Sequence, residues 1–198
     1  MRSPAPVLVL LALSLAAAPA SADDGASAGV QLRVDVEPAA YVLRGYSAHL
    51  RVSLPQVRRL VVGTGAYGFD VPSLMVDLAP DNRGEDWDVR LVVGYNVFFD
   101  YFFAGQKTQG WEAGFQLGLQ HYRARNPAAG DGDARFINAI ALGRVGYEWH
   151  PWSVGFYFFP WLGLAYTTTV SGEARVGAEP YDVFPILPYG AVELGWRF

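Results

Sequence analysis

Three glycines follow an apolar run at the spacing of a nucleotide-binding loop. Gly63, Gly65 and Gly68 in VVGTGAYG match the pattern GxGxxG, in which a strand turns into a helix whose N-terminus holds a pyrophosphate group. Pro72 interrupts the segment that follows, and no strand–helix–strand pattern continues from it. The sequence therefore favours small residues in a crowded strand over a dinucleotide site.

The three histidines could serve as metal ligands or as general bases. His49, His121 and His150 show no pair at metal-ligand spacing. His121 falls near one end of a predicted strand, where a base could act on a membrane lipid, but no serine motif accompanies it as nucleophile. We expect His49 among lumenal charges and His150 in a turn. We predict no catalytic residue, no metal site and no cofactor.

Two acidic clusters offer oxygen ligands for a divalent cation. They are Asp131-Gly132-Asp133 and Glu85-Asp86. Neither continues into an EF-hand loop, which needs further ligands and ends in a bidentate Glu. We interpret both clusters as solvated loop charge. Loosely held Ca²⁺ or Mg²⁺ that bridges the loops to anionic lipid stays open as an alternative.

The composition excludes several classes of protein. The 198 residues include no Cys, which rules out disulfide scaffolds and thiolate sites. With 19 acidic and 15 basic residues, the chain lacks the basic balance of a nucleic-acid binder. Hydrophobic residues reach 52% and charged residues only 17%, so apolar side chains are expected to face outward as well as inward.

The N-terminus has the features of a secretory signal. Arg2 precedes the apolar stretch 7–18, and Ala20-Ser21-Ala22 provides small residues for cleavage. We predict a signal peptide at 1–22 and one domain at 23–198. Beyond the signal, every apolar run is too short to cross a bilayer as a helix. An exported chain with outward apolar surface is then either a soluble β-protein or a membrane β-barrel.

Alternating apolar and polar residues predict eight strands. In GWEAGFQLGLQHYRAR, for example, every second residue from Trp111 to Leu119 is apolar. The eight predicted ranges are 30–43, 46–54, 59–69, 88–103, 110–125, 135–149, 154–168 and 184–198. Short connections alternate with long ones, and the three long loops hold most of the acidic residues. This layout is typical of an antiparallel, eight-stranded, up-and-down transmembrane β-barrel.

The polar face of the strands carries charges of both signs. Acids and arginines on that face can pair inside a narrow lumen, where an unpartnered charge would be costly. The expected lumen network is Arg33, Asp35, Arg51, Arg90, Asp100, Glu112, Arg144, Glu148, Glu193 and Arg197. Eight strands close too tightly for an aqueous channel, so we predict a lumen filled by side chains.

Prolines complicate the last two strands. Pro160 lies within the seventh predicted strand, and Pro185 and Pro188 lie within the eighth. Because proline cannot donate to the ladder, we expect a bulge or a rim position at these residues. The segment Pro72–Leu78 in the first long loop is predicted to form either a short helix or an extra strand. In the second case, a barrel of ten strands would be possible.

The C-terminal sequence GAVELGWRF carries a family resemblance. Its apolar and aromatic residues at steps of two are Val192, Leu194, Trp196 and Phe198. This ending resembles the assembly signal of small Gram-negative outer-membrane β-barrels of the OmpA/OmpX type, and 144–166 is similar to a stretch found in uncharacterised exported barrels. The resemblance implies a location in the outer membrane, contact with its lipid and lipopolysaccharide, and transient binding to the barrel insertion machinery.

These observations predict a non-enzymatic, monomeric outer-membrane protein that is structural or interacts through acidic extracellular loops. Two other classes stay open. One is an enzyme that modifies outer-leaflet lipid through His121. The other is a soluble periplasmic barrel that binds an apolar ligand as lipocalins do, which would need its apolar face inward.

Overall fold

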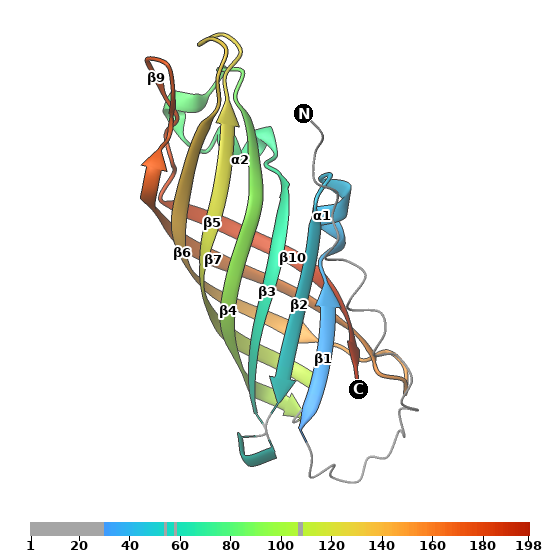
Figure 1. The fold of residues 1–198 in the computed structure, drawn as a ribbon. Helices are drawn as coiled ribbons and strands as arrows, with labels where there is room; N and C mark the ends of the chain where they lie inside the picture. The colour runs from blue at the N-terminus through green and yellow to red at the C-terminus, as the bar shows by residue number, and fades with distance from the viewer. Residues whose placement is uncertain (1–29, 54, 58, 107–108) are drawn as a thin grey trace.

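A computed structural model describes residues 30–198 except 54, 58, 107 and 108. The predicted signal peptide lies outside the described residues. Eight antiparallel strands form a closed barrel in the order β1-β10-β7-β6-β5-β4-β3-β2 (Figure 1). Their bounds are β1 Gln31–Val36, β2 Tyr46–Ser53, β3 Leu60–Asp70, β4 Asp88–Gln106, β5 Gln109–Arg125, β6 Ala134–Glu148, β7 Phe156–Glu173 and β10 Ile186–Arg197. The predicted all-β, eight-stranded, up-and-down barrel is confirmed.

The two ends of the barrel differ. One end, here called the turn end, has the short connections β2–β3, β4–β5 and β6–β7, the first of which contains the 3-10 helix η2 (Pro55–Val57). The other, the loop end, has the long connections 71–87, 126–133 and 174–185 and lies at the top of Figure 1. The predicted alternation of short and long connections is therefore present.

The long loops contain short elements of their own. The first holds α2 (Ser73–Val76) and the 3-10 helix η3 (Pro80–Asn82), so the segment Pro72–Leu78 adds a helix to the fold. Two extra strands come instead from the last loop, where β8 (Arg175–Val176) and β9 (Glu179–Pro180) form a separate hairpin. Within the described residues, no helix has the length and hydropathy needed to cross a bilayer.

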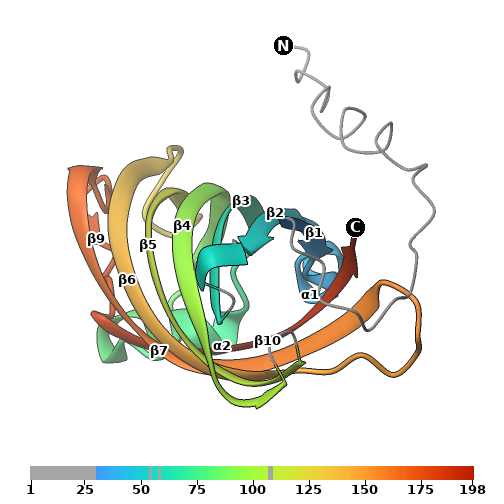
Figure 2. The same cartoon turned by 90° about the horizontal axis from the view of Figure 1, so that it is seen from below.

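The first strand is shorter than its alternation predicts. β1 ends at Val36, and α1 (Pro38–Val42) replaces the rest of the range predicted as strand. Pro38 explains the change, because it has no N–H for a ladder and its fixed φ suits the first turn of a helix. In consequence β1 pairs with β10 only from Arg33 to Val36. Beyond that point α1 packs beside β10, β2 and β3 (Figure 2).

The strand prolines lie where a ladder is already interrupted. Pro160 falls between the last regular β6–β7 pair, Gly146 with Trp161, and the isolated bridge between Trp149 and Phe158. Pro188 pairs with β7 in the part of β10 that has no β1 partner on its other edge. Pro185 precedes β10. Pro185 therefore lies at the expected rim position. Pro160 and Pro188 lie within strands without a bulge, and each is tolerated because the ladder on one side of its strand has no regular pair at that point.

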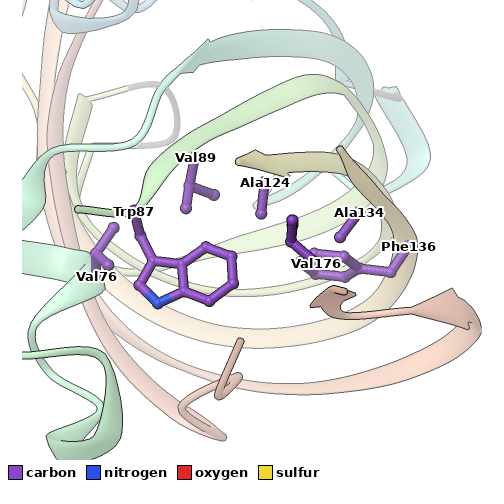
Figure 3. Packing of buried hydrophobic residues seen from close by; sticks show 7 residues of the cluster. All are labelled: Val76, Trp87, Val89, Ala124, Ala134, Phe136 and Val176. Carbon is purple, nitrogen blue, oxygen red and sulfur yellow. The ribbon is translucent and has the colours of Figure 1, made fainter. Parts of the chain in front are cut away.

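The two faces of the wall have opposite character. Charged and polar side chains are buried in the lumen, while large apolar side chains on the outer face stay exposed. Exposed aromatic residues gather at the turn end, among them Trp149, Trp152, Trp196 and Phe198. At the loop end a small apolar core covers the lumen (Figure 3). Its buried members are Val76, Trp87, Val89, Ala124, Ala134, Phe136 and Val176.

Candidate functional site

Arg51 lies at the centre of the lumen. It comes from β2, is fully buried, and its guanidinium meets carboxylates from several other strands. The Arg51 Nε lies 2.8 Å from Asp35 Oδ2, and its Nη1 lies 3.3 Å from Asp100 Oδ2 and 3.6 Å from Glu112 Oε1. Its Nη2 donates to Glu193. One cation thus joins β1, β2, β4, β5 and β10.

A second arginine extends the network across the barrel. Arg144 of β6 binds Asp100 in a bidentate manner, with Nε 3.0 Å from Oδ1 and Nη2 2.7 Å from Oδ2. Its Nη1 donates to Glu193 Oε1 at 3.3 Å. The planar fork of arginine matches a carboxylate in this geometry, so Asp100 and Glu193 are each shared between Arg51 and Arg144.

Another charge cluster lies nearer the turn end. Arg33 Nη1 donates to Glu148 Oε2 at 2.6 Å, and both side chains are fully buried. His150 Nε2 lies 2.8 Å from the other oxygen of Glu148. His150, expected in a turn, therefore also contacts the lumen charges through its ring.

His49 contacts the central cluster. Its Nδ1 lies 3.2 Å from Asp35 Oδ1, in agreement with the expectation that it faces lumenal charges. In the described part of the chain, Asp35, His49 and Glu193 form a cluster of three side chains that could each offer a ligand atom to a metal ion. These atoms lie within 4.8 Å of one another. The Arg51 guanidinium already contacts both carboxylates, so the geometry is that of an ion-pair cluster.

Aromatic rings line the arginines. Phe98 and Phe159 lie on Arg51 with ring centroids 5.0 and 4.7 Å from its Cζ, and on Arg144 at 4.8 and 5.4 Å. Trp161 Nε1 donates to Glu193 Oε1 at 2.9 Å. Cation–π contacts of this kind stabilise a desolvated guanidinium. These rings were not among the residues predicted for the lumen, although the seventh predicted strand, 154–168, is apolar on both faces.

The structure places most of the expected network in the lumen. The buried members are Arg33, Asp35, Arg51, Asp100, Glu112, Arg144, Glu148 and Glu193. Arg197 is half-buried and pairs in register with Arg33. Arg90 was assigned wrongly, because it lies on the outer face and contacts Asp70. A bulge between Leu91 and Val93 reverses the faces, so that Val89 and Leu91 are buried instead.

The lumen is more neutral toward the loop end. Gln120 Nε2 donates to the Tyr67 hydroxyl at 3.0 Å, and Tyr122 donates to Gln120 Oε1 at 3.1 Å. A cavity of about 30 Å³ lies above them, beneath the loops, with Tyr122 and Tyr181 in its lining. Burial and the neighbouring Tyr189 raise the pKa of Tyr181, a loop residue, to about 12. Such a volume holds about one water molecule.

The other residues that the sequence singled out are the glycines of VVGTGAYG and His121. A Cβ at Gly63 would lie 2.2 Å from Phe98 Cζ, and one at Gly65 would lie 2.0 Å from His49 Cδ2, which fits small residues in a crowded strand. His121 has Tyr95 as an edge-on neighbour at 6.4 Å between ring centroids. Among the described residues, His121 makes no hydrogen bond to a hydroxyl group.

The C-terminal residues lie on the outer wall. Val192, Trp196 and Phe198 are exposed there, and Leu194 is half-buried. The backbone N–H of Phe198 donates to Leu32 O at 2.9 Å. The chain therefore ends in contact with its own first strand, with its aromatic residues facing outward.

Comparisons with other proteins concern the fold alone. No protein-family model matches this sequence, and no curated protein matches it. The N-terminal β-barrel domain of Pseudomonas aeruginosa OprF is similar in structure at 12% identity, with a TM-score of 0.44 over 85% of this chain and 96% of that domain. Neisserial surface protein A (NspA) is similar at 13% identity, with a TM-score of 0.38 over 85% of this chain and 94% of that one.

Proposed function

We propose that this chain is a non-enzymatic outer-membrane β-barrel protein that acts through its loops. The observation that carries the proposal is the reversed polarity of its wall. Leu162, Leu164 and Tyr166 of β7 are 70%, 63% and 58% exposed, while Arg33 and Arg51 are fully buried. A continuous apolar wall of this kind exceeds what a soluble monomer exposes, and bilayer hydrocarbon would cover it.

The loops are the part of the molecule available to a partner outside the membrane. They contain exposed acids, including Asp81, Glu85, Asp131 and Glu179. The apolar core beneath them includes Trp87 and joins residues of the first and last long loops to β4, β5 and β6 (Figure 3). We infer a structural or surface-interacting role in which rigid loop bases present acidic loop tips to the exterior.

A conducting pore fits the lumen poorly. Ion pairs and aromatic rings occupy its centre, where Arg51 and Arg144 contact carboxylates from opposite sides of the barrel. Large, stable single-channel currents from the reconstituted protein would contradict the closed lumen.

The two alternatives receive less support. A lipid-modifying enzyme would need a nucleophile beside its base. His121 lies opposite Val93 and Ile137 and has an edge-on contact with Tyr95. A lipocalin-like binder would need an apolar interior, whereas this interior is charged. Unchanged lipid acylation in a His121→Ala strain would remove the enzyme alternative.

Electrophoretic mobility tests the proposal most directly. The protein is taken from the outer-membrane fraction and run with and without boiling in detergent. A closed membrane barrel resists detergent until it is heated, so we expect a shift in mobility. A protein found in the soluble periplasmic fraction, with no shift, would overturn the proposal.

A further inference from the structure

Three arginines lie directly opposite one another on the outer wall near the loop end. Arg90 of β4 pairs in register with Arg123 of β5, which pairs in register with Arg135 of β6. Residues next to them in the chain point inward and are buried, which places the three arginines on the outer face. These inward neighbours are Val89, Leu91, Ala124, Ala134 and Phe136.

The middle arginine has no acidic partner in the part of the chain that the structure describes. Arg90 contacts Asp70, and Arg135 Nε lies 3.3 Å from Asp133 Oδ2. For Arg123, no ion pair or hydrogen bond occurs with any side chain that the structure describes. Like charges directly opposite one another destabilise a sheet. Arg123 is half-buried, lies opposite two other arginines in register and has no carboxylate beside it among the described residues. An anion at Arg123 would therefore lower the free energy.

The row of arginines stands at the border of the apolar wall. The next outward-facing residues toward the turn end are His121 on β5 and Ile137 on β6, which pair in register. The outward-facing residue of β5 after His121 is Leu119. One outward position further toward the loops, Arg125 is opposite Asp88. If the barrel spans the outer membrane as proposed above, Arg123 lies at the level of the outer-leaflet headgroups.

We propose that Arg123, flanked by Arg90 and Arg135, binds a phosphate group of a phosphorylated glycolipid in the outer leaflet. A guanidinium donates two parallel hydrogen bonds to phosphate, as it does to carboxylate. Adjacent strands are about 4.8 Å apart, so neighbouring arginines can contact one phosphate together. The lipid acyl chains would then lie along the apolar wall below.

Lipid titration of the refolded, detergent-solubilised chain tests this site. Native mass spectrometry measures the apparent Kd for diphosphoryl lipid A, for dephosphorylated lipid A and for inorganic phosphate. We expect diphosphoryl lipid A to bind more tightly than the dephosphorylated form. Arg123→Gln should weaken binding of the diphosphoryl form by about tenfold, the loss of one charge-assisted contact, and Arg123→Lys should weaken it less.

Arg125→Gln is the matched control. It removes an outward arginine from the same strand, but one that lies opposite Asp88, and it should leave the affinity unchanged. Equal affinities for Arg123→Gln and the unmodified protein would overturn the site. Equal affinities for the two lipid A forms would show that only the acyl chains bind. Full competition by inorganic phosphate would overturn the assignment to a lipid headgroup.

The boiled and unboiled mobility of each sample separates the two proposals. A variant that keeps the heat-dependent shift is folded, so its loss of lipid affinity reports on the site. If the unmodified protein shows no shift and stays soluble without detergent, the outer-membrane proposal fails. If the unmodified protein shows the shift but binds diphosphoryl and dephosphorylated lipid A with equal affinity, only the Arg123 inference fails.

Discussion

Arg51 illustrates how much one buried side chain can matter. Its guanidinium contacts Asp35, Asp100, Glu112 and Glu193. We expect Arg51→Met to lower the free energy of unfolding by about 3–5 kcal/mol, because it leaves buried carboxylates without their cation. Urea titration of the protein in vesicles, followed by tryptophan fluorescence and by mobility on unheated gels, measures the change.

Arg44→Met is the control for this prediction. Arg44 also contacts a carboxylate, with Nε 3.0 Å from Asp70 Oδ2, but its side chain is 83% exposed. A surface pair of this kind contributes about 0–1 kcal/mol. If Arg44→Met and Arg51→Met lowered the free energy of unfolding equally, burial of the ion pair would not determine the size of the loss.

Single residues also show what the sequence could predict. The alternation of apolar and polar residues along each strand predicted that Arg51, Arg144 and Glu193 face the lumen, and all three are buried in the structure. The prediction for Arg90 was wrong because the bulge between Leu91 and Val93 exchanges the inward and outward faces of β4. Alternation alone contains no signal for a bulge. The contact of His150 with Glu148 depends on how the chain leaves β6, which strand periodicity does not describe.

At the scale of the strand, glycine marks where the lumen has no room. Gly63 of β3 lies against the Phe98 ring, whereas Gly143 of β6 has no atom within 4 Å of the position a Cβ would take. We expect Gly63→Ala to destabilise the barrel by about 1–3 kcal/mol through overpacking. Gly143→Ala makes the same change in open space and should be near neutral.

The midpoint of urea unfolding compares the two glycine variants under identical conditions. A Gly63→Ala midpoint at or above that of Gly143→Ala would show that Phe98 moves aside at little cost. Sequence alone could not rank these positions, because both glycines lie in strands and only the tertiary arrangement brings Phe98 to one of them.

The number and order of the strands could be predicted because every second residue reports on the same face. Their ends were less predictable. Pro38 ends β1 early in favour of α1, and the extra hairpin of β8 and β9 arises in a loop where no alternation exists. Turn and loop elements depend on local backbone chemistry and on the core around Trp87, which periodicity does not encode.

For the whole molecule, the position of each outward-facing residue along the bilayer normal can be measured by the cost of replacing it with arginine. Leu162 is exposed in the apolar part of β7, and Thr168 is exposed six positions nearer the loop end. In vesicles, we expect Leu162→Arg to cost about 2–4 kcal/mol and Thr168→Arg about 0–1 kcal/mol. Unfolding in urea after refolding into phosphatidylcholine vesicles measures both, and equal costs would contradict a membrane-spanning wall.

The pairing of β1 with β10 has a consequence for how the chain reaches its native state. The ring closes between residues from opposite ends of the sequence, Arg33 with Arg197 and Val36 with Leu194. No partial product of synthesis can complete it, and contacts of such high sequence separation form slowly. Until β10 is available, β1 has a free edge and the apolar surface of the barrel is uncovered, which is a condition in which chains aggregate. Closure of the barrel therefore depends on β10, the strand that lies furthest along the chain from its partner β1.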